Sequence, residues 1–157
     1  MNLVEKYSDI KSSGYLPAVN LKSAGHKGMG VFASKDFEKE EAIEFCHCMI
    51  FDWPAKYQRD STISRYAYSV SCHCNPGPTR PPCLLNCPAN GTRYILPLGY
   101  GAIYNCADKQ EEANASFAII PDQLLMVFGA TKQIKKGEEI VTWWGQGYYD
   151  AWCKPKT

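Results

Sequence analysis

The sequence lacks any apolar run long enough to cross a bilayer, and it has no charged segment followed by an apolar leader. Its net charge is only +1, which argues against a protein that holds nucleic acid mainly by neutralising phosphates. We therefore expect an intracellular protein, cytoplasmic or nuclear, with no membrane contact and no direct nucleic-acid partner. With 157 residues, 45% of them hydrophobic, the chain is long enough to bury the core of one domain.

Cysteine is not scarce, because the chain has eight. In an exported protein they would suggest disulfides, and the Asn90-Gly91-Thr92 and Asn114-Ala115-Ser116 triplets would suggest glycosylation. Without a leader, we expect reduced cysteines and chance triplets. Cys46 and Cys48 fall in an apolar segment, where free cysteines usually serve as packing residues.

Four of the cysteines lie in an insert at residues 72–88, in C-x-C and C-x3-C pairs. Prolines at four positions of this insert exclude regular structure, so we expect a cross-link or a bound metal ion to hold the segment in place. A tetrahedral structural zinc is one candidate, and free thiols or two disulfides are the alternatives. The candidate zinc ligands are Cys72, Cys74, Cys83 and Cys87.

Hydrophobic periodicity predicts a mostly β protein with one short helix at its start. Apolar residues at helical spacing place that helix within residues 1–15. Short apolar or alternating runs predict strands at 16–21, 30–33, 42–51 and 64–70.

A weak internal repeat relates residues 33–43 to residues 130–140, which share Ala, Lys, Glu and Ile positions. A Val-Phe pair precedes each copy. Two copies are too few for a solenoid. They predict two similar hairpins packed side by side.

Two stretches, 96–106 and 136–149, concentrate glycines, large aromatic side chains and one Asn. A glycine in or beside a strand usually marks a close backbone approach or a ligand. We therefore expect the two stretches to form one pocket.

Four motifs occur in the order and spacing of a SET domain. They are Lys27-Gly28-Met29-Gly30-Val31-Phe32-Ala33, Leu98-Gly99-Tyr100-Gly101-Ala102-Ile103-Tyr104-Asn105, Asn114-Ala115, and Gly137-Glu138-Glu139-Ile140 with a following aromatic residue and Gly145. The resemblance covers residues 16–150, leaves 151–157 as a tail, and is closest to small single-domain SET proteins of the viral kind. It implies several short curved sheets with a C-terminal pseudoknot. It also makes a homodimer plausible, and a host-cell location if the protein is viral.

The resemblance further implies protein-lysine methylation, with S-adenosylmethionine as the methyl donor, a protein or peptide lysine as the substrate, and no catalytic metal. It assigns cofactor contacts to Lys27, Gly28, Met29, Gly30, Tyr104, Asn105 and Cys106, and an adenine cover to Tyr149 or Trp152.

Three positions differ from the family pattern, one of them Ala113, which replaces the Pro usually found before the second Asn. Cys106 replaces the usual His, and Trp144 replaces a Tyr whose hydroxyl lies beside the transferred methyl. An indole cannot accept a hydrogen bond as that hydroxyl does. In one interpretation Trp144 walls the lysine channel while Tyr100 or Tyr148 supplies the hydroxyl. The alternatives are a SET-fold module that binds peptide or cofactor without turnover, and a structural or zinc-bearing interaction protein.

Overall fold

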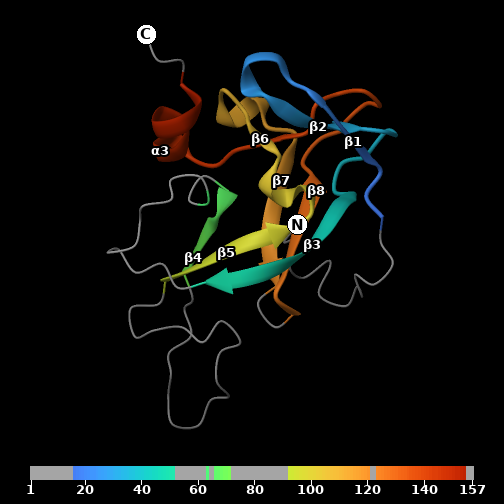
Figure 1. The fold of residues 1–157 in the computed structure, drawn as a ribbon. Helices are drawn as coiled ribbons and strands as arrows, with labels where there is room; N and C mark the ends of the chain where they lie inside the picture. Colours follow the sequence, from blue (N-terminus) through green and yellow to red (C-terminus); the bar gives the residue numbers. More distant parts are fainter. Residues whose placement is uncertain (1–15, 52–62, 64–65, 72–91, 121–122, 155–157) are drawn as a thin grey trace.

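The computed structural model describes residues 16–51, 63, 66–71, 92–120 and 123–154 (Figure 1). The strands are β1 (Val19–Ser23), β2 (Met29–Ala33), β3 (Ala42–Phe51), β4 (Tyr68–Ser71), β5 (Thr92–Leu98), β6 (Asn105–Cys106), β7 (Ala115–Ile120), β8 (Leu125–Ala130) and β9 (Val141–Thr142). Single helical turns lie at η1 (Gly25–Lys27), η3 (Tyr100–Ala102) and η4 (Gln110–Glu112), and the described chain ends in α3 (Gln146–Tyr148) and the π-helical η6 (Tyr149–Cys153).

The strands form two sheets, which confirms the prediction of a mostly β fold. β1 and β2 pair as an antiparallel ribbon, and the other strands form a seven-stranded sheet in the order β4-β5-β3-β8-β7-β9-β6. The ribbon and the C-terminal turns lie at the same end of the larger sheet as β6 (Figure 1), with which β9 pairs.

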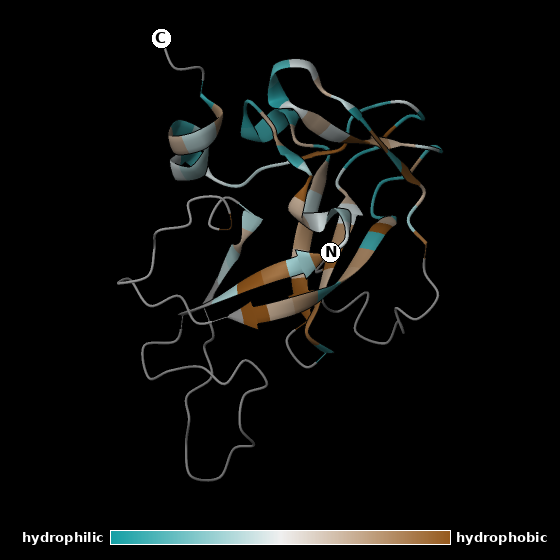
Figure 2. Ribbon diagram, in the orientation of Figure 1, coloured by the Kyte–Doolittle hydropathy of each residue, from teal (hydrophilic) through white to brown (hydrophobic). Residues whose placement is uncertain are grey.

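The core is centred on β8, whose six residues are all buried. Hydrophobic residues concentrate on the central strands, whereas the turns around the ribbon are hydrophilic (Figure 2). β3 shows the predicted alternation, with Glu44 and Cys46 buried and His47 and Met49 exposed. Ile43 is buried as well, because a register shift between Ala42 and Glu44 interrupts the alternation as a β-bulge does.

The C-terminal strand β9 runs parallel to both β6 and β7 and lies between them. The segment that joins β6 to β7 therefore crosses over β9, which is the tucked arrangement expected of the pseudoknot. The Asn114 side chain fixes the crossing, because its Nδ2 donates to the Glu139 carbonyl (2.8 Å) and its Oδ1 accepts from the Val141 N–H (2.9 Å).

The internal repeat has a structural counterpart, but the prediction of two hairpins was wrong. In neither copy do the flanking strands pair with each other, since β2 pairs with β1 and β8 lies between β3 and β7. Instead the copies pair with one another about an approximate two-fold axis. Phe37 and Ile134, at equivalent positions, exchange both backbone hydrogen bonds (2.8 and 2.9 Å), and Glu40 to Ala130 (2.8 Å) mirrors Gly137 to Ala33 (2.8 Å).

The equivalence of Glu40 and Gly137 predicts a stabilising substitution. Both residues have a positive φ, 69° at Glu40 and 91° at Gly137, which costs a residue with a Cβ about 1–2 kcal/mol. Glu40→Gly should therefore raise the free energy of unfolding by up to about 1 kcal/mol, after the larger backbone entropy of glycine in the unfolded chain is subtracted. Urea unfolding would show a higher midpoint at an unchanged slope. Gly137→Ala should lower the midpoint, and an unaffected midpoint would contradict the strain argument.

Several predictions concern residues outside the described ranges. These are the helix within 1–15, the insert at 72–88 with its four candidate zinc ligands, and residues 64–65 of the strand expected at 64–70. The described start of that strand is a correction, because Tyr66 is helical and β4 begins only at Tyr68. Within the described residues no group of three or more potential metal ligands occurs, and no helix there is long and apolar enough to span a membrane. The final helical turns reach Cys153, inside the segment expected to be a tail.

Candidate functional site

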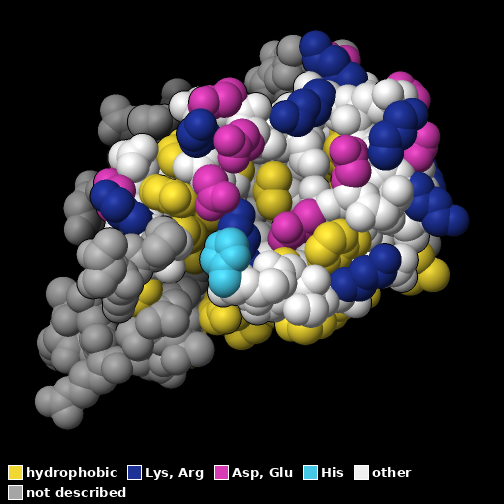
Figure 3. Space-filling view, turned by 90° about the horizontal axis from the view of Figure 1, so that it is seen from above, with side chains coloured by type: hydrophobic (Ala, Val, Ile, Leu, Met, Phe, Trp, Pro, Cys, Tyr) yellow, Lys and Arg dark blue, Asp and Glu magenta, His cyan; other side chains and the backbone are white. Residues whose placement is uncertain are grey.

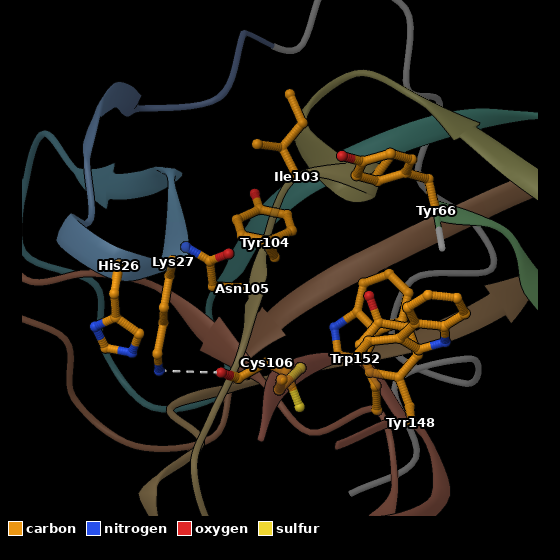
Figure 4. Close-up of a pocket in the computed structure, with 12 residues that line it drawn as sticks. His26, Lys27, Tyr66, Ile103, Tyr104, Asn105, Cys106, Tyr148 and Trp152 are labelled. Atoms are coloured by element: carbon orange, nitrogen blue, oxygen red, sulfur yellow. Dashed lines mark hydrogen bonds between the residues drawn. The ribbon is translucent and has the colours of Figure 1, made fainter. Parts of the chain in front are cut away.

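A cavity of about 240 Å³ lies between the η1 turn and the C-terminal helical turns. In Figure 4, His26 and Lys27 stand on one side of it and Tyr148 and Trp152 on the other. The remaining lining residues come from the chain in and before β6, from the segment before β4, and from the C-terminal part of the chain. They are Tyr66, Ala102, Ile103, Tyr104, Asn105, Cys106, Trp144 and Cys153.

A second hollow of about 660 Å³ adjoins the first, because both are lined by Lys27, Tyr66, Ala102, Ile103 and Asn105. Its other lining residues are Gly28, Met29, Leu96, Pro97 and Gly99. The two stretches singled out in the sequence therefore contribute to one continuous site, together with the 26–29 turn.

Polar groups at the turn end of the site have defined partners. Lys27 Nζ donates to the Cys106 carbonyl (3.2 Å) and pairs with Asp108 (3.2 Å). Asn105 Nδ2 donates to the Met29 carbonyl (3.1 Å) and to Glu139 Oε1 (2.7 Å). Gly28 joins η1 to β2 at a φ of 82°, a conformation that a residue with a Cβ rarely adopts.

A buried carboxylate supports the floor of the site. Glu44 is 4% exposed and accepts hydrogen bonds from the Tyr100 N–H (2.9 Å) and the Tyr104 hydroxyl (2.9 Å). Burial raises the pKa of Glu44 above its ordinary value, and burial together with the nearby Glu44 raises the pKa of Tyr104 well above its own. Tyr104 is therefore a fixed, neutral wall of the cavity and not a base.

Three aromatic rings stack beneath the C-terminal turns. Trp144 lies between Tyr68 (centroids 4.4 Å apart) and Tyr148 (4.7 Å), with an interplanar angle of 29° in both pairs. The Tyr68 hydroxyl donates to the Gly101 carbonyl (3.0 Å). The indole Nε1 of Trp144 is buried and has no partner within the described residues. The stack therefore carries an unsatisfied donor at the edge of the site.

The described cysteines, which are Cys46, Cys48, Cys106 and Cys153, form no disulfide with one another. Cys46 is buried as a packing residue, and burial raises the pKa of Cys48 to about 11. Burial and the neighbouring Cys106 raise the pKa of Cys153 to about 12. The thiols of Cys48 and Cys153 are therefore protonated at neutral pH and are poor nucleophiles.

Comparison with known families decides the identity of the fold. The SET domain profile matches residues 28–145, which is most of the chain. The chain belongs to the SET-domain family. No curated protein is detectably similar to the sequence. Membership confirms the resemblance found in the motifs, whereas the likeness to the viral kind stays a prediction.

Two solved structures share this SET fold. One is a candidate histone methyltransferase from Plasmodium falciparum, with a TM-score of 0.55 and 24% identity over 89% of this chain and 100% of that one. The other is the SET8 protein of Cryptosporidium, with a TM-score of 0.56 and 15% identity over 83% of this chain. The matched region spans 58% of the Cryptosporidium protein.

The structure gathers most of the residues that the sequence proposed for the cofactor. Lys27, Tyr104, Asn105, Cys106 and Trp152 line the smaller cavity, and Gly28 and Met29 line the larger hollow. The other two line neither cavity: Gly30 is buried, and Tyr149 lies against Trp143, with ring centroids 6.0 Å apart.

The three residues proposed for catalysis, Tyr100, Trp144 and Tyr148, likewise differ in whether they line a cavity. Trp144 and Tyr148 line the smaller cavity. Tyr100 lines neither cavity, and its N–H is bound by Glu44.

Sequence reasoning missed Glu44, Glu139, Tyr66 and His26. Glu44 had a signal, because it is the one carboxylate in a mostly apolar strand. Tyr66 lines both cavities. The sequence suggested no partner for His26, which takes its place only when the η1 turn meets the C-terminal turns.

The face viewed from above in Figure 3 carries positive and negative side chains interspersed, with hydrophobic side chains between them. Ion pairs such as Lys109–Glu112 (3.8 Å) and Lys135–Asp36 (3.0 Å) join opposite charges of the described residues. The side chains described on this face therefore form no large field of one sign, and the expectation of no direct nucleic-acid partner stays a prediction.

Proposed function

We propose that this SET protein is an S-adenosylmethionine-dependent protein-lysine N-methyltransferase. Family membership supports lysine methylation of proteins in general. The observation that carries the finer proposal is the joined pair of cavities, with polar groups at the turn end and aromatic walls at the other. The histone methyltransferase description of the Plasmodium protein favours a basic protein as the substrate.

The turn end of the site fits the amino-acid part of the cofactor. Lys27 Nζ supplies a cation for its carboxylate, and the oxygen of the Asn105 amide supplies an acceptor for its ammonium. Gly28 has open space where a side chain would stand, so the backbone there is accessible. When bound, S-adenosylmethionine supplies an electrophilic methyl group on a sulfonium.

The aromatic end of the site fits the requirements of the lysine substrate. A free lysine has a pKa of about 10.4, so presenting its neutral amine at pH 7 costs about 4.6 kcal/mol at about 1.36 kcal/mol per unit. Walls made by Trp144, Tyr104 and Ile103 exclude water and disfavour the ammonium form, which lowers this cost. Alignment of amine and methyl supplies much of the remaining acceleration. Aromatic faces also stabilise the cationic groups.

Tyr148 is our choice for the hydroxyl that orients the lysine amine. It extends from α3 into the cavity (Figure 4), and its stack on Trp144 fixes the ring. Trp144 itself offers only a donor and no acceptor. Tyr66, which lines both cavities, carries another hydroxyl at the site, whereas the Tyr104 hydroxyl is bound to Glu44.

Tyr148→Phe should lower the rate of methyl transfer by roughly 10- to 100-fold, because one oriented hydrogen bond to the reacting group is lost. Its affinity for S-adenosylmethionine should be unchanged. Radiolabelled methyl transfer to acid-extracted basic proteins is the measurement. Tyr100→Phe is the matched control, since the Tyr100 hydroxyl lies outside both cavities, and equal losses in the two variants would contradict the assignment.

The alternative is a SET module that binds without turnover, and Trp144 at the position of the usual tyrosine favours it. The Trp144→Tyr substitution distinguishes the active methyltransferase from the module without turnover. If Trp144 walls the channel, the smaller ring opens it and methyl transfer falls. A rise in transfer would show that position 144 has lost a catalytic hydroxyl.

A further inference from the structure

We propose that Glu139 is a positioning residue that fixes the orientation of the Asn105 amide for the cofactor's ammonium. The inference rests on the proposed use of S-adenosylmethionine and refines it. Glu139 lies just before β9, half-buried, and lines neither cavity. Its effect on the ligand is therefore transmitted through Asn105.

The two neighbours of the Asn105 amide nitrogen decide which way the amide faces. They are the Met29 carbonyl (3.1 Å) and Glu139 Oε1 (2.7 Å). A carbonyl and an ionised carboxylate both accept hydrogen bonds and cannot donate them, so neither tolerates the amide oxygen at this place. Figure 4 shows the nitrogen of the Asn105 amide on the side of Lys27 and its oxygen on the side of Tyr104, which lines the cavity. The oxygen is thus presented as an acceptor.

The glycine at position 30 makes this arrangement possible. A Cβ at position 30 would lie 2.5 Å from Glu139 Oε1 and 3.1 Å from Asn105 Nδ2. Since real contacts of a Cβ are longer than 2.5 Å, a side chain here would displace the carboxylate. Gly30 therefore serves the site by leaving room for Glu139, which differs from the direct cofactor contact that the sequence suggested.

The backbone of Glu139 is held by the pseudoknot. Its carbonyl accepts from Asn114 Nδ2 (2.8 Å), and it forms a bridge with Phe32 of β2. The Glu139 backbone is thus held in place, and its carboxylate contacts the Asn105 amide directly. An ammonium has three donors and no acceptor, so it pairs with the amide oxygen and is repelled by the amide nitrogen. If Glu139 no longer held the Asn105 amide, the amide could rotate, and its oxygen would be presented to the ammonium only part of the time.

Calorimetric titration with two ligands tests the proposal. S-adenosylhomocysteine carries the ammonium, and 5′-methylthioadenosine lacks the whole amino-acid part. Glu139→Ala should weaken S-adenosylhomocysteine about 10-fold, the loss expected when one charge-assisted hydrogen bond becomes misaligned. It should leave 5′-methylthioadenosine within about two-fold. Glu139→Gln should stay within about three-fold for both ligands, because its amide oxygen still accepts from Asn105.

Each other outcome has a definite reading. Equal losses of both ligands in Glu139→Ala would show a merely structural role and overturn the inference, as would unchanged binding of both. Glu139→Gln as weak as Glu139→Ala would assign the effect to charge and overturn the orientation argument. If the wild-type protein binds neither ligand, the proposed function itself fails.

Discussion

Replacing Glu44 with Ala is expected to lower the free energy of unfolding by about 2–4 kcal/mol. The substitution leaves two donors without an acceptor, the Tyr100 N–H and the Tyr104 hydroxyl, and an unsatisfied buried group costs about 1–3 kcal/mol. Removing a buried carboxylate returns part of that cost. Chemical unfolding measures the loss.

A matched surface substitution separates this effect from a general sensitivity to lost charge. Glu112→Ala removes a carboxylate whose side chain is 50% exposed and pairs with Lys109 at 3.8 Å, and it should change stability by less than about 0.5 kcal/mol. If Glu44→Ala lowered the free energy of unfolding by no more than Glu112→Ala does, the proposed role of Glu44 in supporting the site would be contradicted.

The same residue predicts a pH dependence. Because burial raises the folded-state pKa of Glu44 above 4.5, the folded protein binds this proton more tightly than the unfolded chain does. The contribution of Glu44 to stability is therefore fully present below its unfolded pKa. It is lost as the pH rises from about 4.5 through the folded value. Glu44→Gln should remove this component from a series of unfolding curves, and an unchanged profile would contradict it.

Replacing Asn105 with Ala is expected to weaken S-adenosylmethionine binding by roughly 10- to 150-fold, the range for one hydrogen bond to a charged group. The variant loses the acceptor at the turn end while the aromatic end stays intact. Calorimetry and the ligand-induced rise in melting temperature measure the change. Asn20→Ala, an exposed substitution of the same kind on β1, is the control and should bind as the wild type does.

Local patterns in the sequence were enough for some of the strands and for several of the residues that line the site. The alternating run at 42–51 predicted β3 with its observed bounds, and the glycine motifs placed Gly28 and Asn105 at the same site. The repeat was visible, but its pairing was not. Pairing of Phe37 with Ile134 is a long-range event that a local hairpin signal does not encode.

The residues that hold the site in place without lining it were not predicted, for a different reason. A glutamate in a turn is normally exposed to solvent, so Glu139 did not stand out before its partners were known, whereas the signal of Glu44 in a mostly apolar strand was present but was not used. Gly30 was assigned a direct contact because glycine motifs suggest close approach, whereas the space it leaves is filled by Glu139 and Asn105. Tyr100 lay between two glycines, which instead accommodate Glu44, Cys46 and Phe128.

Titration of S-adenosylmethionine into the purified protein tests the central claim most directly. We expect saturable binding of one cofactor per chain, weakened by Asn105→Ala and unaffected by Tyr148→Phe. Together these results would separate the cofactor end of the site from the lysine end. The absence of binding to the wild-type protein would contradict the methyltransferase account and leave a SET-fold interaction module in its place.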